Sequence, residues 1–455
     1  MRTPKVAVIG GGLAGITSAL RLADAGCAVV LLEAKPRLGG LTASFRRGDL
    51  AIDTGQHVFL RCCTSYRALL DRLHATSMTE LQDRLDVAVV RASDGRRGRL
   101  SRSNLPVLAG LPLHLGRSLA SYAVMPPTAR LAAVRAALAL RAVDPADPAT
   151  DDRSFGSWLA AHGQPPEAID ALWDLVGVAT LNARSDDASL ALAATVFQLG
   201  LLTESGAGDI GWASAPLQDV HGESAMRELA AAGVEIRLRT KVTSLEAAPE
   251  GWLVHTGDGS EPAAAVVVAA EPPQAERMLP GDALDLPAGW SDQLGSTPIV
   301  NAHAVFDRTV MTEPFLACVG SPLQWLFDRT RPSGLSEGQY LAASVSAADD
   351  IAGRSVAELR SWLLAEIERV LPAAGGADLV DFFVTREPHA TFRQAPGSGR
   401  WRPQTATRYD GLVMAGAHTA TGWPATMEGA VRSGDAAAAQ ILATLHRPAH
   451  EGVAA

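Results

Sequence analysis

The chain has 455 residues, of which 47% are hydrophobic and 5% aromatic, and a formal net charge of −9. This length predicts two or three domains, and the negative charge argues against nucleic acid as the main partner. No apolar run predicts a transmembrane helix, and the first residues predict a strand rather than a signal peptide. The cysteines lack metal-site or disulfide spacing, which is typical of a reducing cytoplasm: Cys27, Cys62, Cys63 and Cys318.

A glycine-rich turn joins a strand pattern to a helix pattern near the N-terminus. The strand covers 5–9, the helix runs through Ala25, and a second strand over 27–32 ends on Glu33. The turn between strand and helix is Gly10-Gly11-Gly12-Leu13-Ala14-Gly15, which fits G-x-G-x-x-G. Strand, turn, helix, strand and an acid about 20 residues on together predict a dinucleotide-binding, Rossmann-like α/β unit.

The residues of this turn have separate predicted roles. Gly10 allows the turn, Gly12 lets backbone approach a pyrophosphate, and Gly15 lets helix and strand pack closely. The start of the helix, at Leu13 and Ala14, supplies N–H donors to the phosphates. Glu33 is expected to bind the adenosine ribose diol and to repel the 2′-phosphate of NADP.

The segment that follows Glu33 narrows the choice of cofactor. It reads Glu33-Ala-Lys-Pro-Arg37-Leu-Gly39-Gly40, of the form E-x3-R-x-G-G. This octet resembles the extended fingerprint of amine-oxidase-like and desaturase-like flavoproteins, in which the arginine and the paired glycines bind the FAD diphosphate. The resemblance implies FAD rather than NAD, with Thr42 also in the site. A second G-x-G-x-x-G in a strand context does not occur, so no separate NAD(P)H domain is expected.

A second motif, Asp53-Thr-Gly55-Gln56-His57, follows a short apolar segment. It resembles the D-x-G segment that passes beside the isoalloxazine ring in the amine-oxidase superfamily. The G-Q-H version is similar to the squalene-associated, FAD-dependent desaturases now understood as hydroxysqualene dehydroxylases. The resemblance implies that Gly55, Gln56 and His57 contact FAD. His57 is either an acid near the flavin or a polar residue bonded to backbone, and both interpretations stay open.

The middle of the chain is expected to return to the cofactor domain. Alternating apolar and charged residues predict a half-buried strand over 233–242. A hairpin between 252–254 and 264–269, with Asp258-Gly259 at its turn, is predicted next. Val242 corresponds to the superfamily residue that contacts adenine through its backbone, a role implied by the resemblance alone.

The C-terminal part resembles the superfamily's flavin motif. A strand over 412–415 leads to Gly416-Ala417, and a helix is predicted to about Leu445. Pro424 suits its first turn, and the resemblance implies that Thr426 and Met427 contact the flavin. Many relatives have G-D where this chain has Gly416-Ala417, so another group must hold the ribityl chain here.

The intervening segments are expected to form a substrate domain. Helix patterns cover 154–159, 168–179 and 188–202, and strand patterns cover 298–305 and 323–328. In a strand Trp325 and Phe327 share one face, which is either the wall of an apolar pocket or a packed sheet face.

Residues 91–141 are strongly basic. Their only acid is Asp94, and Leu131, Val134 and Leu138 recur at helical spacing. The segment has nine arginines: Arg91, Arg96, Arg97, Arg99, Arg102, Arg117, Arg130, Arg135 and Arg141. A basic amphipathic region predicts contact with a membrane surface, although a solvated helix would also carry arginines. The expected location is therefore cytoplasmic and peripheral on the inner face of the cell membrane.

The resemblance implies a discontinuous FAD-binding Rossmann-like domain of amine-oxidase type over 1–60, 206–279 and 401–455. A mixed sheet-plus-helices substrate domain is expected over 61–205 and 280–400.

Three functions compete. The first is reductive dehydroxylation of hydroxysqualene to squalene, with His57 as the acid, Asp328 or Glu387 as substitutes, and Asp53 orienting either the loop or the cofactor. The second is oxidative desaturation of a C30 or C40 polyene, and the third is non-catalytic prenyl-lipid binding. Polyamine oxidation is less favoured, since no lysine outside the cofactor strands is available beside the flavin. The electron donor is not identified by the sequence.

Overall fold

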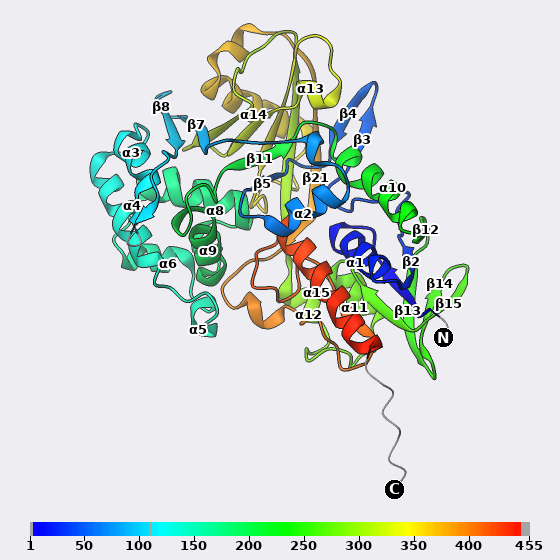
Figure 1. Cartoon of the computed structure of the whole chain (residues 1–455). Coiled ribbons are helices and arrows are strands. Elements are labelled where there is room, and N and C mark those ends of the chain that lie inside the picture. The colour runs from blue at the N-terminus through cyan, green and yellow to red at the C-terminus, as the bar shows by residue number, and fades with distance from the viewer. Residues whose placement is uncertain (1–2, 109–110, 447–455) are drawn as a thin grey trace.

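A five-stranded parallel sheet carries the glycine turn (Figure 1). The computed structural model describes residues 3–108 and 111–446. In spatial order the strands are β12 (Glu235–Arg237), β2 (Ala28–Leu32), β1 (Lys5–Ile9), β16 (Ala265–Val268) and β22 (Leu412–Met414). Parallel strands covered on both faces need continuous apolar runs, and Val6, Ala7 and Val8 are fully buried. The sheet takes strands from three separate parts of the chain.

Two helices far apart in the sequence pack together beside this sheet (Figure 1). They are α1 (Leu13–Asp24), which follows the glycine turn, and α15 (Met427–Leu445). Gly434 allows their close approach, because an added Cβ there would lie 2.4 Å from the Ala14 carbonyl oxygen. The Ser18 hydroxyl donates to the Gly434 carbonyl oxygen at 3.1 Å. Two further helices pack against this pair: α2 (Thr64–Arg72) and α10 (Ser224–Ala231).

A small antiparallel sheet corrects two sequence predictions. Its strands are β13 (Val242–Ala248), β14 (Gly251–Thr256) and β15 (Gly259–Ala263). The single strand predicted over 233–242 is wrong, because the chain turns between β12 and β13 and Arg239 has a φ of +56°. The predicted hairpin partner 264–269 is also wrong. β14 pairs with β15, whereas β16 enters the parallel sheet, where its unbroken apolar run is buried on both faces.

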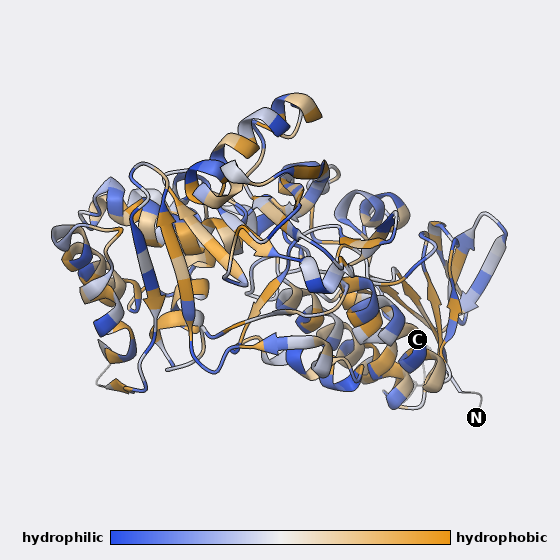
Figure 2. Cartoon of the chain, turned by 90° about the horizontal axis from the view of Figure 1, so that it is seen from above, coloured by the Kyte–Doolittle hydropathy of each residue, from blue (hydrophilic) through white to orange (hydrophobic). Residues whose placement is uncertain are grey.

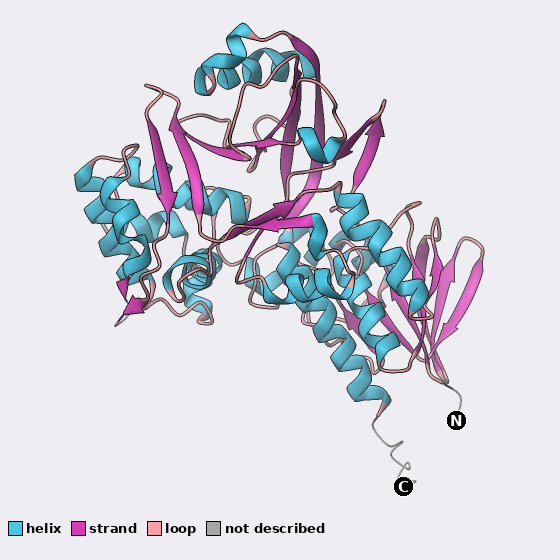
Figure 3. Cartoon of the chain, turned by 45° about the horizontal axis from the view of Figure 1, so that its top comes forward, coloured by secondary structure: helices cyan, strands magenta, loops and turns pink. Residues whose placement is uncertain are grey.

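A seven-stranded sheet forms the second large element (Figure 3). In spatial order its strands are β21 (Leu379–Phe392), β17 (Ser296–Phe306), β20 (Gln339–Val345), β19 (Trp325–Asp328), β18 (Phe315–Val319), β7 (Asp86–Arg91) and β8 (Arg97–Ser101). Only β18 and β7 pair in parallel. The helix α14 (Val356–Val370) packs against this sheet and buries Leu359, Leu363 and Ile367. Figure 2 shows hydrophobic residues concentrated along the strands.

Most remaining helices gather at one end of the seven-stranded sheet (Figures 1 and 3). They are α3 (Leu113–Ser121), α4 (Pro127–Leu140), α5 (Pro148–Asp151), α6 (Phe155–Ala161), α7 (Pro166–Ala168), α8 (Asp174–Leu181) and α9 (Leu190–Phe197). The helices predicted over 168–179 and 188–202 are confirmed, each including a π-helical turn, at Ile169–Trp173 and Gln198–Leu202. Trp173 packs against Phe155 and Phe197 at centroid distances of 5.8 and 5.0 Å. Within the described residues no helix is long and apolar enough to cross a membrane.

A three-stranded sheet lies between these parts: β5 (Val58–Leu60), β11 (Ile210–Ala213) and β6 (Thr79–Leu81). Next to it, the fully buried Asp209 carboxylate accepts hydrogen bonds from Arg61 and Arg102 and from the Leu85 amide. A hairpin of β3 (Ser44–Arg47) and β4 (Leu50–Asp53) precedes β5. The predicted α/β class, with a Rossmann-like sheet and a separate mixed sheet-plus-helices part, is confirmed.

Candidate active site

The glycine turn forms an open cradle at the start of α1. Gly12 caps the helix without a side-chain hydrogen bond, and the first turn contains no acid. Its N–H groups can therefore bind an anion together with the helix dipole. A Cβ added at Gly12 would meet only Gly40 Cα, at 3.9 Å. The absence of a side chain at Gly12 therefore leaves room for a ligand rather than for protein.

Gly10 and Gly15 have structural roles instead. Gly10 has a φ of +108°, and a Cβ there would lie 2.3 Å from the Ala269 carbonyl oxygen. A Cβ at Gly15 would lie 1.9 Å from the Gly10 carbonyl oxygen. These distances agree with the predicted division of roles, in which these two glycines serve the turn and its packing.

The E-x3-R-x-G-G segment packs directly against this cradle. The Gly39 amide donates to the Gly11 carbonyl oxygen at 2.8 Å, and the Glu33 carboxylate accepts from the Gly11 amide at 2.5 Å. Arg37 Nη1 donates to the Gly40 carbonyl oxygen at 3.1 Å. The Thr42 hydroxyl donates to Gly39 at 2.8 Å and closes the turn. The structure thus brings together the predicted diphosphate and ribose residues.

The C-terminal motif lies beside the same cradle. Gly416 has a φ of +136° and its amide donates to the Ser433 hydroxyl at 2.8 Å. The Thr426 hydroxyl caps α15 by accepting from the Gly429 amide at 3.1 Å, so the helix begins at Met427. The predicted place of Pro424 in the first helical turn is wrong, because this residue precedes the N-cap. The uncommitted N–H groups at this helix start suit the electron-rich edge of a flavin.

Arg402, which the sequence did not single out, holds the loop that joins Gly416 to the start of α15. Its guanidinium is buried and donates to four backbone carbonyl oxygens, those of Ala417, His418, Thr419 and Trp423. Burial lowers the pKa of Arg402 to about 10, partly opposed by Asp151. Hydrogen bonds to backbone have no sequence signature, so only the fold reveals this contact.

Ala417 has no side chain that could bind a polar group, and its neighbour His418 is buried. The Nε2 atom of His418 has no hydrogen-bond partner among the described residues. Burial, reinforced by the charge of Arg402, lowers the pKa of His418 to about 3. An orphaned buried nitrogen beside the motif that lacks its acid fits a site that binds a polar group, such as the ribityl chain of FAD.

The segment 53–57 meets the seven-stranded sheet. The Gly55 carbonyl oxygen accepts from His57 Nδ1 at 3.2 Å. Burial is the main cause that lowers the pKa of His57, so the imidazole is mostly neutral at neutral pH. His57 does not line the pocket described below, whereas its neighbour Gln56 does.

The two substitute acids have different surroundings. The Asp328 carboxylate accepts from the Thr330 amide and hydroxyl and from Gln339 Nε2, which makes it part of a local turn. Glu387 is partly exposed and close enough to Arg37 to raise the pKa of that guanidinium, against the larger lowering effect of burial. Val242 begins β13 and is buried, and its adenine contact stays a prediction.

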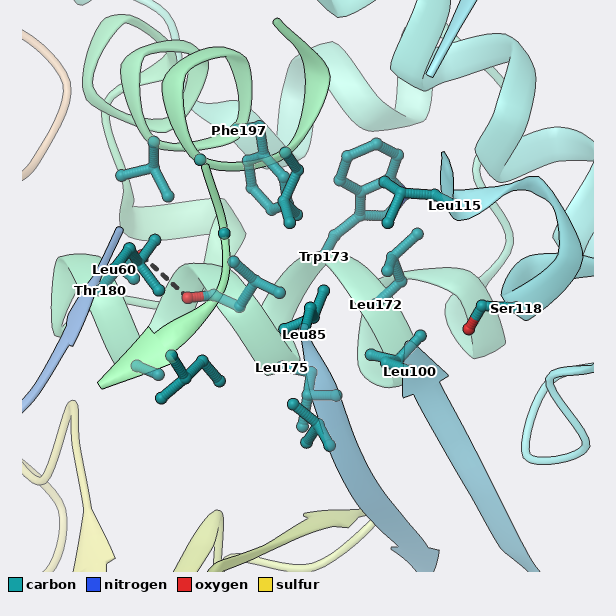
Figure 4. Close-up of a pocket in the computed structure, with 18 of the residues that line it drawn as sticks. Leu60, Leu85, Leu100, Leu115, Ser118, Leu172, Trp173, Leu175, Thr180 and Phe197 are labelled. Carbon is teal, nitrogen blue, oxygen red and sulfur yellow. Dashed lines mark hydrogen bonds between the residues drawn. The ribbon is translucent and has the colours of Figure 1, made fainter. Parts of the chain in front are cut away.

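A long apolar pocket extends from this segment to the helical end of the molecule (Figure 4). Its cavity volume is about 330 Å³. At one end are Gln56, Ile299 and Ser344, and at the other are Leu113 on α3 and Val134 on α4. The described lining includes no charged side chain. This volume lies within the range of about 300–1,000 Å³ that is usual for small-molecule pockets, and the uncharged lining suits an apolar ligand.

The seven-stranded sheet supplies one wall of the pocket, a role that the sequence alone did not decide. Trp325 and Phe327 both line the pocket, and their rings stack at a centroid distance of 6.2 Å. Residues two apart on a strand point to the same face, so both side chains can face the pocket. They therefore form a pocket wall and not only a packed sheet face.

The positive charge of residues 91–141 is largely neutralised by nearby acids. Most of its arginines pair with acids: Arg91 and Arg96 with Asp94, Arg97 with Glu313, Arg99 with Asp86, and Arg102 with Asp209. Arg130 instead donates to the carbonyl oxygens of Ala120 and Met125. The exposed apolar side chains nearby are Leu105, Leu113, Leu131 and Val134.

Comparison with known proteins agrees with this site. Residues 13–442 match the family described as flavin containing amine oxidoreductase. Hydroxysqualene dehydroxylase from Rhodopseudomonas palustris is 28% identical, over 96% of this chain and 98% of that protein. Zeta-carotene desaturase from Synechocystis sp. is 24% identical, over 97% of this chain and 98% of that protein.

Solved structures show the same fold. Cyclohexylamine oxidase from Brevibacterium oxydans superposes with a TM-score of 0.73 at 20% identity, covering 98% of this chain and 100% of that one. Putrescine oxidase superposes with a TM-score of 0.71 at 19% identity, covering 97% of this chain and 99% of that one. The cofactor is FAD, for which the cradle of Gly12, Glu33 and Arg37 is suited. The chain therefore belongs to the flavin-containing amine oxidoreductase family.

Proposed function

We propose that this protein removes the hydroxyl group of hydroxysqualene reductively and forms squalene. The observation that carries the proposal is the long apolar pocket that starts at Gln56 and has no charged residue in its described lining. An uncharged, mostly apolar lining suits a hydrocarbon chain better than a polyamine cation or another highly polar substrate. Relatives that cover almost the whole chain include hydroxysqualene dehydroxylases at 28% identity.

The chemistry requires three contributions. Reduced FAD supplies a hydride, which replaces the hydroxyl on carbon. A proton must reach the leaving oxygen so that it departs as water, and the pocket must exclude bulk water from the carbon. We infer that His57, which adjoins the pocket-lining Gln56 but does not itself line the pocket, supplies this proton through a side-chain movement or one bridging water. General acid assistance is typically worth about 10²–10⁴ in rate.

The test is an anaerobic incubation of the photoreduced protein with hydroxysqualene in D₂O, followed by mass spectrometry. Squalene should form, with one deuterium on the carbon that lost oxygen. The oxidised protein is the control and should form none. Failure of fully FAD-loaded, reduced protein to form squalene would exclude the proposed reaction.

A second function is oxidative desaturation of a polyene. It is favoured by the 24% identity to zeta-carotene and phytoene desaturases over 96–97% of this chain. The oxidised protein should then introduce a double bond into phytoene or a similar polyene, and should fail to convert hydroxysqualene when reduced. A non-catalytic lipid-binding module would do neither, although it would still bind the hydrocarbon.

We also propose that the helical end of the pocket rests on a membrane. Leu113 and Val134 line the pocket and are also exposed, so the apolar lining continues onto the surface between α3 and α4. Arg117 and Arg135 are exposed beside these residues. A bilayer there would give a water-insoluble substrate a direct route into the pocket.

A further inference from the structure

The pocket has one unexplained polar feature where the 53–57 segment contributes Gln56 to its lining. Among the described residues, seven buried side-chain nitrogen or oxygen atoms lack a hydrogen-bond partner. Only one of them, Nε2 of Gln56, belongs to a residue that lines the pocket. An unpaired buried donor costs about 1–3 kcal/mol. An unpaired donor on a residue of this mostly apolar lining points to an acceptor that arrives with a ligand.

The surroundings of Gln56 supply further polar groups. Ser344 lines the same end of the pocket, and it is in register with Asn301 and Trp325 on the neighbouring strands. Asn301 Nδ2 donates to the Thr54 carbonyl oxygen at 3.4 Å, while its Oδ1 is buried without a partner. Polar groups therefore gather at this end of the lining, beside the segment that resembles the flavin-contacting D-x-G segment.

Two other polar side chains of the lining, those of Ser118 and Thr180, are already bonded. Ser118 Oγ donates to the Arg99 carbonyl oxygen at 3.0 Å, and Thr180 Oγ1 donates to the Val176 carbonyl oxygen at 2.8 Å (Figure 4). Both hydroxyls satisfy backbone groups of the protein and are not needed by a ligand. The unused donor of Gln56 thus differs from these two bonded hydroxyls.

We propose that the side-chain amide of Gln56 binds the hydroxyl oxygen of the substrate. The inference rests on the proposed function and names the feature that distinguishes an alcohol from a pure hydrocarbon in this pocket. Gln56 Nε2 donates to the oxygen, while the chain of the substrate occupies the apolar lining. An amide has no proton to release at ordinary pH, so Gln56 orients the carbon–oxygen bond and does not act as the acid.

The test measures binding to the oxidised, FAD-loaded protein without turnover. Hydroxysqualene and squalene are titrated anaerobically, and the visible absorption of the flavin reports occupancy. Wild type should bind the alcohol about tenfold more tightly than the hydrocarbon, which is the worth of one hydrogen bond of about 1.4 kcal/mol. Equal affinities would overturn the proposal without any variant.

Two variants sharpen the result. Gln56→Leu and Gln56→Met should lose the preference for the alcohol and keep the affinity for squalene. Thr180→Val removes a bonded hydroxyl from the same pocket and should change both affinities by the same factor. A preference that persists in both Gln56 variants would overturn the proposal. Loss of FAD from both folded variants would also overturn it, since the amide would then serve the cofactor.

The binding result and the reaction can fail separately. If wild type forms squalene while the Gln56 variants keep the preference, the proposed function stands and the role of Gln56 is wrong. If wild type forms no squalene but its alcohol preference depends on Gln56, the hydroxyl-binding site stands and the reaction is wrong. Identical affinities together with no squalene would exclude both.

Discussion

Arg329 and Asp53 form a buried ion pair, with 2.6 Å between Arg329 Nη2 and Asp53 Oδ2 and side-chain exposures of 8% and 5%. Arg329 also donates to the Ala213 carbonyl oxygen, and Asp53 accepts from the Leu217 amide. The pair fixes the start of the 53–57 segment against the seven-stranded sheet. Asp53 therefore orients the loop through the protein, which is one of the two roles that the sequence suggested.

Breaking this pair should strongly destabilise the fold. Arg329→Met leaves the Asp53 carboxylate buried without its partner, which typically costs about 3–5 kcal/mol. Urea unfolding of FAD-loaded protein measures the change. Arg331→Met is the control, since Arg331 is 84% exposed and 3.8 Å from Glu80, and its loss should cost less than about 1 kcal/mol. Equal effects of the two variants would contradict the structural role of the buried pair.

The glycines of the first turn should respond differently to substitution. Gly12→Val should leave the protein folded but without FAD, because its side chain has space within the protein and blocks the phosphates. Gly15→Ala should instead destabilise the protein itself, since its Cβ collides with the Gly10 carbonyl oxygen. Circular dichroism reports whether the protein is folded, and the ratio of flavin to protein absorption reports the fraction of protein that carries FAD. Full flavin occupancy in folded Gly12→Val would contradict the assignment of the cradle.

Arg402 should control the affinity for FAD through the loop that it holds. Arg402→Met leaves four carbonyl oxygens without their donor, and the cost should reach at least about 2 kcal/mol. If the loop positions the flavin edge, FAD should bind more weakly by tenfold or more, measured by fluorescence on reconstitution. Arg400→Met is the control, because Arg400 is exposed and pairs with Asp152 at the surface. Unchanged FAD affinity in Arg402→Met would show that the loop needs no such support.

If His57 is the acid, the rate of squalene formation should depend on pH in a definite direction. The pKa of His57 lies below the ordinary value of about 6.5, so only a minority of the imidazole is protonated at neutral pH. If His57 is the acid, squalene formation should speed up as pH falls from about 7.5 toward this lowered pKa. His57→Ala should be slower by about 10²–10⁴ and should lose that slope. A variant within a few-fold of wild type at every pH would leave His57 as a structural residue, bonded to Gly55.

The sequence revealed the parts of the site that are local in the chain. The glycine turn, Glu33 and the Arg37 octet were predictable because each role depends on short spacing and on backbone conformation. Arg402 and Arg329 were not, since their partners are backbone carbonyls or an acid far away in the sequence. The break at Arg239 was missed because alternation of residues continues through it. The vacant hydrogen bond of Gln56 is likewise a property of the folded pocket alone.

The last prediction concerns the surface where the pocket opens. Leu131 is 54% exposed on α4, in the same exposed patch as Arg135, whereas most other arginines of this segment already have acidic partners. If this surface docks on lipid, anionic liposomes should retain the protein and added salt should weaken the attachment. Leu131→Ser with Arg135→Glu should release it in sedimentation while the FAD content stays unchanged. Val380→Ser with Arg354→Glu is the control, since it changes one exposed apolar and one basic side chain outside residues 91–141, and it should sediment like wild type. Equal sedimentation of both double variants would mean that these exposed residues are solvated and that the substrate enters by another route.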